Sequence, residues 1–297
     1  MTGTGIIDQF LETFTRYIDN GFGLLGSDVG YLAATLAAID ITLAALFWSW
    51  GPDEDIIARL VKKTLFVGVF ASRKVKETDL PLSLALGLLG INGVTAYFGL
   101  LDIGQPRPGD TVIVSTAAGA VGSAVGQIAK LMGCRTVGIT GGPAKSRLCL
   151  EEFGYDAIID YKSDEVSEAL MASCPQGGDV YFDNTAGKIS DAVLPMMNVG
   201  ARIVICGTAS VASWDPVPIG PRVERHLLVK RARMSGFLVF DYKHRYEEAI
   251  DRIAAWVREG RILYREDIDV GIECCPDAIA KLYRGENLGK QLIRLSR

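Results

Sequence analysis

The sequence predicts an α/β fold with a doubly wound parallel sheet, preceded by a helical segment. Three observations support this prediction. Short apolar runs alternate with amphipathic stretches after residue 111, a glycine-containing turn follows the first of these runs, and an apolar stretch of membrane length lies near the N-terminus. The chain has 297 residues, enough for two domains, which we place at residues 1–71 and 72–297.

Composition excludes some classes of function. The net charge is −4, so no basic excess points to nucleic acid as a partner. The chain has six cysteines and two histidines, and no cysteine pair has the short spacing of a zinc site. We therefore expect reduced thiols and no bound metal.

The N-terminal segment has the pattern of two helices. Apolar residues recur at three- and four-residue steps between Ile6 and Ile18, as in an amphipathic helix. Residues 29–50 are almost entirely apolar, and a helix of that length rises roughly 33 Å, enough to cross a bilayer. Asp40 would cost about 3 kcal/mol at mid-membrane, so it needs a partner or a bundle interior. The alternative is a buried helix of a soluble domain, and a signal peptide is disfavoured because the preceding region is long and acidic.

The distribution of basic residues predicts the orientation of this span. Arg16 is the only basic residue before it, whereas six lysines and arginines follow between residues 59 and 76. The positive-inside rule then puts the C-terminal domain in the cytoplasm, attached to the inner membrane. The chain would be cytoplasmic if the segment did not insert.

Residues 1–71 also resemble a known protein family. The stretches GTGIIDQFLETFTRYIDNGFGLLG and ALFWSWGPDEDIIARLVKKTLFVGVFA are similar to the beginning of the TrbL-type conjugal-transfer protein, a polytopic inner-membrane component of type IV secretion systems. In that family the apolar run at 64–71 would continue into a second span, but here SRKVKETDLPLS follows. We therefore interpret the chain as a fusion.

From residue 111 onwards the pattern predicts alternating strands and helices. The expected strands are Thr111–Ser115, Arg135–Thr140, Ala157–Asp160, Val180–Asp183 and Arg202–Cys206. The expected helices are Gly119–Met132, Ala144–Phe153, 164–172 and 187–197. Right-handed crossovers would bring the carboxyl ends of the strands to one edge, where ligands bind in such sheets.

The first strand-to-helix turn carries a dinucleotide-binding fingerprint of the Rossmann type. It is Ala117-Ala118-Gly119-Ala120-Val121-Gly122, which is G-x-G-x-x-G with alanine in the first place. Gly119 would let the backbone approach a diphosphate, and Gly122 would let the helix pack closely on the strand. The free N–H groups and the positive helix end would face the phosphates. The alternative is a small-residue helix start without a ligand.

The residues after the second strand predict NADPH as the cofactor. An NAD site normally has an acid there to bind the ribose hydroxyls, but this chain has Thr140-Gly141-Gly142-Pro143. Lys145 follows, and a cation at this place favours a 2′-phosphate. The alternative is that Lys145 is an exposed residue near a helix start.

Residues 72–297 resemble a second family. The stretches LPLSLALGLLGINGVTAYFGLLDIGQPRPGDTVIVSTAAGAVGSAVGQIAKLMGCRTVGITGG, DVYFDNTAG, VKRARMSGFLVFDY and GENLGK are similar to the zinc-independent medium-chain dehydrogenases/reductases, in the prostaglandin reductase and alkenal/alkenone reductase branch. The resemblance implies NADPH-dependent reduction of the C=C bond of α,β-unsaturated aldehydes and ketones, by hydride transfer to the β-carbon. It also implies a homodimer.

The same resemblance implies which residues bind the cofactor. They are Ala118, Gly119, Val121 and Gly122 at the diphosphate, Lys145 and Tyr161 at the adenosine phosphate, Asn184 beside the cofactor, Cys206, Gly207, Thr208, Phe237, Leu238 and Val239 at the nicotinamide, and Asn287 closing over the cofactor. Each has a simpler alternative. Tyr161 could be a strand-end aromatic, Phe237 and Val239 core residues, and Asn184 and Asn287 turn residues.

Two departures from the family pattern leave the catalytic residues unassigned. The family's β-rich N-terminal catalytic domain is replaced by residues 1–71, and Val211 and Ala212 stand where many relatives have a tyrosine. Three functions remain open at this point: a membrane-tethered enone reductase, a non-catalytic NADPH-binding fusion product, and a conjugal-transfer membrane component with a passenger domain.

Overall fold

The computed structural model describes residues 80–211 and 215–294. Residues Leu86–Arg297 pack as one compact unit, which is the unit described below. The predicted span at 29–50, the TrbL-like stretch and the boundary placed at 71/72 lie outside the described residues and stay predictions. Among the helices that are described, none combines the length and the apolar character needed to cross a membrane.

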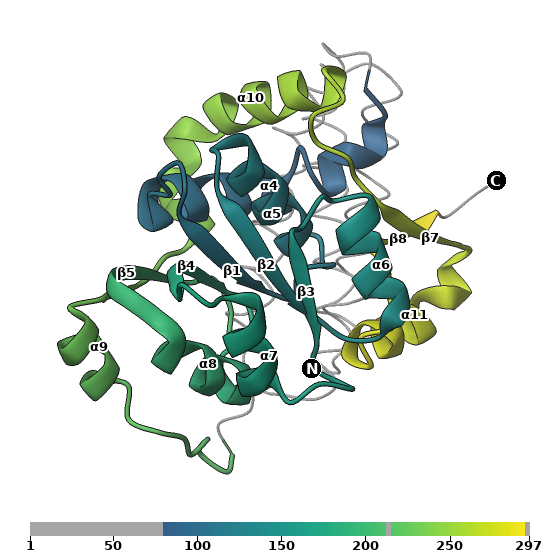
Figure 1. Ribbon diagram of the computed structural model, residues 1–297. Helices are drawn as coiled ribbons and strands as arrows, with labels where there is room; N and C mark the ends of the chain where they lie inside the picture. The colour runs from purple at the N-terminus through teal and green to yellow at the C-terminus, as the bar shows by residue number, and fades with distance from the viewer. Residues whose placement is uncertain (1–79, 212–214, 295–297) are drawn as a thin grey trace, which may run out of the picture. The chain divides into compact units, whose positions relative to one another are not determined.

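A six-stranded parallel sheet forms the centre of the unit (Figure 1). Its strand order is β3-β2-β1-β4-β5-β6, so the chain winds outwards in two directions from β1 and β4. The strands are β1 (Thr111–Ser115), β2 (Arg135–Thr140), β3 (Ala157–Asp160), β4 (Gly178–Asp183), β5 (Met197–Ile205) and β6 (Arg233–Gly236). The predicted doubly wound parallel sheet is confirmed, and its switch point lies between β1 and β4.

Helices cover both faces of the sheet. The α-helices are α4 (Ile91–Phe98), α5 (Gly122–Leu131), α6 (Pro143–Glu151), α7 (Val166–Ser173), α8 (Gly187–Val193), α9 (Glu224–Lys230), α10 (Tyr246–Arg258) and α11 (Cys275–Tyr283). The helices α4, α5 and α10 pack together against one face, whereas α7 and α8 pack together and α9 lies against β5 (Figure 1). Strand residues such as Ile113 and Tyr181 are buried in one cluster with Leu170 of α7 and Val193 of α8.

The sequence predicted some elements less well than others. The strands β1, β2 and β3 have the expected bounds, whereas β4 and β5 begin earlier than expected. β6 was not predicted, because its four residues, RMSG, are mostly exposed and lack an apolar run. The strands β7 (Glu266–Val270) and β8 (Lys290–Arg294) form a separate two-stranded parallel sheet, with α11 between them in the chain.

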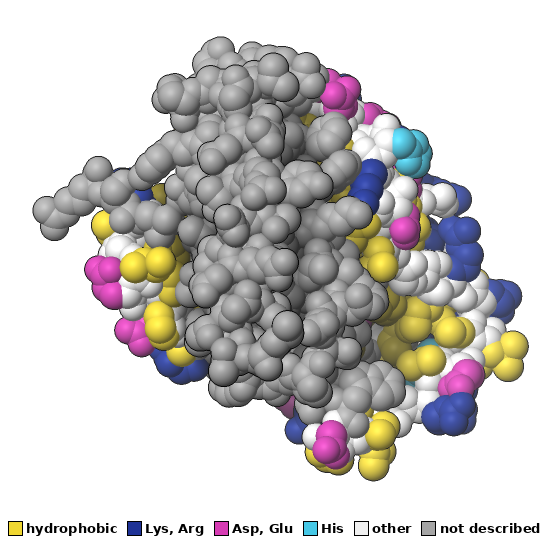
Figure 2. All heavy atoms as spheres, turned by 180° about the vertical axis from the view of Figure 1, so that it is seen from behind, with side chains coloured by type: hydrophobic (Ala, Val, Ile, Leu, Met, Phe, Trp, Pro, Cys, Tyr) yellow, Lys and Arg dark blue, Asp and Glu magenta, His cyan; other side chains and the backbone are white. Residues whose placement is uncertain are grey.

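Exposed apolar side chains occur in the loop before α9 and on α9, in the segment that precedes the edge strand β6. The residues are Val217, Ile219, Leu228 and Val229, and Ile219 is fully exposed. Figure 2 shows hydrophobic side chains at the surface on the side of the unit where β5 and α9 lie. An unpaired strand edge with apolar neighbours is a surface that another chain can cover.

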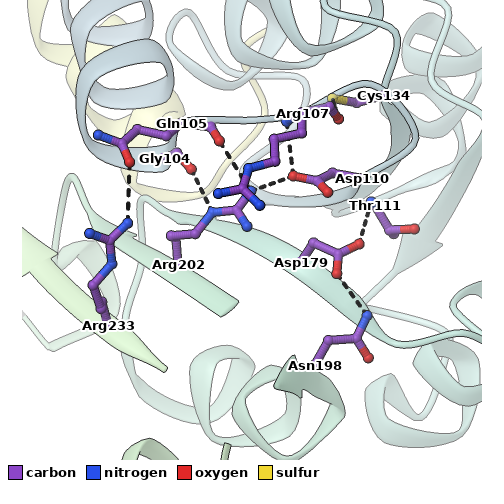
Figure 3. Close-up of polar contacts among 10 residues, drawn as sticks. All are labelled: Gly104, Gln105, Arg107, Asp110, Thr111, Cys134, Asp179, Asn198, Arg202 and Arg233. Carbon is purple, nitrogen blue, oxygen red and sulfur yellow. Dashed lines mark hydrogen bonds and ion pairs between the residues drawn. The ribbon is translucent and has the colours of Figure 1, made fainter. Parts of the chain in front are cut away.

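A network of polar contacts lies at the amino ends of β1, β4 and β5 (Figure 3). The Arg202 guanidinium donates to the Gly104 carbonyl at 2.9 Å and forms an ion pair with Asp110. Asp179 accepts from the Thr111 N–H at 2.8 Å and from the Asn198 amide at 2.9 Å. These contacts fix the strand starts and leave the carboxyl ends of the strands to the candidate site.

Candidate cofactor-binding site

The turn after β1 is tighter than the sequence suggested. Thr116 has a left-handed backbone with φ 55°, and its carbonyl accepts the Gly119 N–H at 2.9 Å. The helix α5 therefore begins at Gly122, and the prediction that it begins at Gly119 is wrong. Because residues 117–121 form a loop ahead of the helix, their N–H groups are not all used by helical hydrogen bonds.

Glycine is required at the end of this turn. A methyl group at Gly122 would lie 2.2 Å from the Thr116 carbonyl oxygen, so no larger residue fits without moving the backbone. The Gly122 carbonyl in turn accepts the Tyr155 hydroxyl at 2.7 Å. Ala118 is buried, whereas Gly119 and Val121 are half-buried at the surface of the turn.

A segment far along the chain completes this turn. Gly119 forms an isolated parallel β-bridge with Gly289. Asn287, two residues earlier, is half-buried, and its side chain donates to the Gly289 carbonyl at 2.9 Å. The structure therefore brings Asn287 close to the fingerprint turn and gives its side chain a turn-stabilising contact, while its expected role of closing over the cofactor stays a prediction.

Lys145 and Tyr161 lie at the carboxyl ends of β2 and β3. Lys145 is half-buried in the first turn of α6. Burial, and secondly the charge of Lys162, lower the pKa of Lys145 below that of an ordinary lysine. The Tyr161 ring packs against Gly141, where a methyl group would lie 2.8 Å from it. Two cations and an aromatic ring thus surround the β2–α6 loop.

An acidic residue that the sequence reasoning missed reaches the same loop. Asp160, at the end of β3, accepts the Gly142 N–H at 2.8 Å and the Lys162 N–H at 3.0 Å. The end of β2 has no acidic residue, but parallel pairing of β2 and β3 places Asp160 directly beside Thr140. Because Asp160 ends the predicted strand Ala157–Asp160, its place at the carboxyl edge of the sheet could have been predicted.

Asn184 and the loop after β5 lie on the other side of the switch point. The Asn184 amide donates to the Ser115 carbonyl at 2.7 Å, which connects the ends of β4 and β1. A methyl group at Gly207 would lie 2.8 Å from the Asn184 carbonyl oxygen, so these two loops are in close contact. Burial, and secondly the charge of Asp183, raise the pKa of the neighbouring Cys206 to about 12, while Thr208 is exposed.

The remaining predicted residues follow β6. Phe237 packs close to Gly99, where a methyl group would lie 2.6 Å from the ring. Leu238 is exposed, and Val239 is buried. The Val239 carbonyl accepts the Tyr246 hydroxyl at 3.0 Å. Thus Val239 has at least a packing role, and Leu238 has a side chain free to meet a ligand.

Comparison with known proteins identifies the family. A family model described as "Zinc-binding dehydrogenase" matches residues 120–255. The NADPH-dependent curcumin reductase of Escherichia coli is 45% identical over 72% of this chain and 64% of its own length. The NADP(+)-dependent 2-alkenal reductase of Nicotiana tabacum is 41% identical over 85% of this chain and 71% of its own length. The chain belongs to the medium-chain dehydrogenase/reductase family.

A solved medium-chain dehydrogenase/reductase has the same fold. The crystal structure of CurA from Vibrio vulnificus in complex with NADPH aligns with a TM-score of 0.67 and 45% identity, over 72% of this chain and 65% of that one. The present chain thus spans about two thirds of the length of these medium-chain relatives. Among its described residues, no group of three or more histidine, cysteine, aspartate or glutamate side chains is arranged to hold a metal ion.

Proposed function

We propose that the chain is an NADPH-dependent reductase acting on the C=C bond of α,β-unsaturated aldehydes and ketones. This proposal depends most on the half-buried Lys145 in the first turn of α6, directly after the β2–α6 loop, where sheets of this kind contact the adenosine ribose. A second cation, Lys162 after β3, is close enough to lower the pKa of Lys145. The names of the relatives, an NADP-dependent 2-alkenal reductase and an NADPH-dependent curcumin reductase, support the same cofactor and the substrate class.

The described residues fit NADPH at both ends of a dinucleotide. At the diphosphate, Gly122 leaves no room for a side chain, and the loop ahead of α5 supplies N–H groups. At the 2′-phosphate, Lys145 and Lys162 supply positive charge and Tyr161 a ring and a hydroxyl. Asp160 also lies at this end of the site, where its carboxylate accepts the N–H groups of Gly142 and Lys162.

The nicotinamide half would lie across the ends of β4, β5 and β6. Asn184, Cys206, Gly207 and Thr208 would line it, together with Phe237 and Leu238, and Asn287 would cover the diphosphate. NADPH supplies the hydride when bound, and the residues of this chain orient it and exclude water. Because burial keeps the Cys206 thiol protonated at neutral pH, we assign that residue a contact role.

A binding titration tests this proposal. The wild type should bind NADPH more tightly than NADH, and Lys145→Ala should weaken NADPH about tenfold while leaving NADH nearly unchanged. Lys130→Ala is a matched control, because Lys130 pairs with Asp156 away from this loop. An equal effect of Lys145→Ala on both cofactors would contradict the phosphate assignment.

Turnover separates the reductase from the non-catalytic alternative. Oxidation of NADPH by simple enals or enones would support a reductase. NADPH binding without turnover on any enal or enone would instead favour a cofactor-binding fusion product. The conjugal-transfer alternative depends on residues 1–71 and is tested by deleting them and measuring conjugation.

We further propose a homodimer formed through the β6 edge. The unpaired edge of β6 supports it, as do the exposed Val217, Ile219, Leu228 and Val229 in the segment that precedes β6 in the chain. Light scattering should give the mass of a dimer for the wild type and that of a monomer for Leu228→Glu. A wild-type monomer would contradict this proposal. Attachment to the inner membrane through residues 29–50 is a separate prediction, tested by cell fractionation.

A further inference from the structure

Asp183, the last residue of β4, has an unusual environment. It is 1% exposed, and it stands at the carboxyl edge of the sheet beside the switch point. One carboxylate oxygen accepts the Thr185 N–H at 2.9 Å and the Ala186 N–H at 2.8 Å, and the Ser115 hydroxyl donates to the same oxygen at 3.3 Å. The other oxygen accepts the Ser190 hydroxyl. In the described part of the chain, no cation forms an ion pair with it.

The backbone of Asp183 adds a third loop to this network. Its carbonyl accepts the N–H groups of Cys206 at 2.8 Å and Gly207 at 3.1 Å. The Ser210 hydroxyl donates to the carbonyls of Thr185 at 2.8 Å and Ala186 at 2.9 Å. The end of β1 and the loops that follow β4 and β5 therefore meet at one buried residue.

The loop after β4 needs this support. Ala186 has φ 60° and ψ −163°, a backbone conformation that is essentially limited to glycine and costs a side-chain-bearing residue free energy. Its N–H points at the Asp183 carboxylate, so the hydrogen bond compensates for the strain. Without that acceptor, residues 184–187 would relax to another conformation.

The position of Asn184 depends on the same group. Its N–H donates to the Ser115 hydroxyl oxygen at 2.8 Å, and that hydroxyl in turn donates to Asp183. Its side-chain amide donates to the Ser115 carbonyl. Asp183 thus determines where Asn184 lies, although its own carboxylate is buried away from any ligand.

We propose that Asp183 is a positioning residue that fixes the nicotinamide half of the cofactor pocket, while the adenosine half at Lys145 is independent of it. This inference rests on the proposed NADPH-binding function. It predicts that loss of Asp183 weakens the binding of NADPH but not that of 2′,5′-ADP. The reason is that 2′,5′-ADP contains the adenosine and its 2′-phosphate but lacks the nicotinamide.

The test compares three variants by titration with NADPH and with 2′,5′-ADP. Asp183→Ala should weaken NADPH binding about tenfold and change 2′,5′-ADP binding less than about twofold. Asp183→Asn should restore most of the NADPH affinity, because its carbonyl oxygen can accept the same N–H groups and its amide can donate to the Ser190 hydroxyl. Asp179→Asn, at the amino end of the same strand, is the matched control and should leave both ligands unaffected.

Hydrogen exchange gives a readout that does not need any ligand. The amides of Thr185 and Ala186 should exchange faster in Asp183→Ala, with little change in the β1 and β2 amides. If Asp183→Ala does not fold, Ser190→Ala should show the same pattern with a smaller effect, since it removes one of the contacts.

The outcomes distinguish this inference from the proposed function. If the wild type bound neither NADPH nor 2′,5′-ADP, the proposed function would fail, and protected Thr185 and Ala186 amides would still show the loop held by Asp183. If Asp183→Ala weakened both ligands equally, or left NADPH binding and amide exchange unchanged, the positioning role would be overturned.

Discussion

Gly119 and Gly289 pair across an isolated parallel β-bridge, although almost the whole sheet lies between them in sequence. The bridge joins the fingerprint turn to the segment that carries Asn287, so the candidate diphosphate site is made of two distant pieces of chain. Its geometry depends on glycine at position 289, where φ is 72°.

Replacing Gly289 should therefore lower both the free energy of unfolding and the affinity for NADPH. A methyl group there would lie 2.2 Å from the Arg265 carbonyl oxygen, in addition to the left-handed backbone. We expect Gly289→Ala to lower the free energy of unfolding by about 3 kcal/mol in urea titrations and to weaken NADPH binding. Gly260→Ala is the control, since Gly260 has φ 68° with no atom within 4 Å and should lose only about 1 kcal/mol. Equal losses would show that the contact with Arg265 is unimportant.

Tyr155 should contribute both to the stability of the fold and to NADPH binding at the fingerprint turn. Its buried hydroxyl donates to the Gly122 carbonyl at 2.7 Å, and its ring fills the space beside Gly126. Tyr155→Phe keeps the ring and should cost about 1 kcal/mol in thermal or urea unfolding, with weaker NADPH binding. Tyr97→Phe, which loses the hydrogen bond of a buried tyrosine to Glu248 on α10, should cost about as much and leave NADPH binding unchanged. The reverse pattern would contradict a role for Tyr155 at the turn.

The preference for NADPH should depend on pH through Lys145. Burial and Lys162 lower the pKa of Lys145, so it loses its proton at a lower pH than an ordinary lysine. NADPH affinity should therefore fall as the pH rises through that pKa, while NADH affinity stays flat. The contribution to fold stability has the opposite sign, because the folded chain binds this proton less tightly than the unfolded chain and the penalty disappears as the pH rises.

Calorimetric titrations across the alkaline range measure this effect. Lys145→Arg should keep NADPH affinity constant over the same range, because the guanidinium stays charged. A wild-type profile that matched that of Lys145→Arg would show that Lys145 does not face the phosphate.

The ion pair between Arg202 and Asp110 should stabilise the fold without affecting the site. Their side chains are only 11% and 16% exposed, so Arg202→Met leaves a nearly buried carboxylate without its partner. We expect a loss of about 3 kcal/mol in urea unfolding and unchanged NADPH affinity. The pair of Arg222 and Glu224 is highly exposed, so Arg222→Met should lower the free energy of unfolding far less than Arg202→Met. Weaker NADPH binding by Arg202→Met would show that the two ends of the sheet are coupled.

The sequence predicted the buried strands β1 and β2 well because burial on both faces requires a continuous apolar run. Val112 to Val114 and Val137 to Ile139 lie in fully enclosed strands, and their apolar runs gave the bounds of β1 and β2. β6 was missed because its four residues are mostly exposed and form no apolar run, whereas the other edge strand, β3, has the apolar run Ala157–Ile159. The start of α5 was placed too early because Thr116 adopts a left-handed conformation that its residue type does not suggest.

The candidate site was predicted only where one stretch of chain carries the signal. The fingerprint and Lys145 each follow a strand directly, so their neighbourhood could be predicted. Asp160 accepts from the loop after β2, and Asp183 accepts from Ser115 at the end of β1. Such contacts between neighbouring strands follow from sheet order rather than from spacing along the chain. The Gly119–Gly289 bridge is the extreme case, because no local pattern marks it.

The contacts of Arg202, Asp110 and Asp179 hold the starts of the strands independently of the loops at the far edge (Figure 3). Loops after β4, β5 and β6 could therefore be exchanged with those of relatives that act on other compounds, without rebuilding the frame that carries them. An engineer seeking new specificity would keep the contacts of Arg202, Asp110 and Asp179 and vary the loops at the carboxyl ends of the strands.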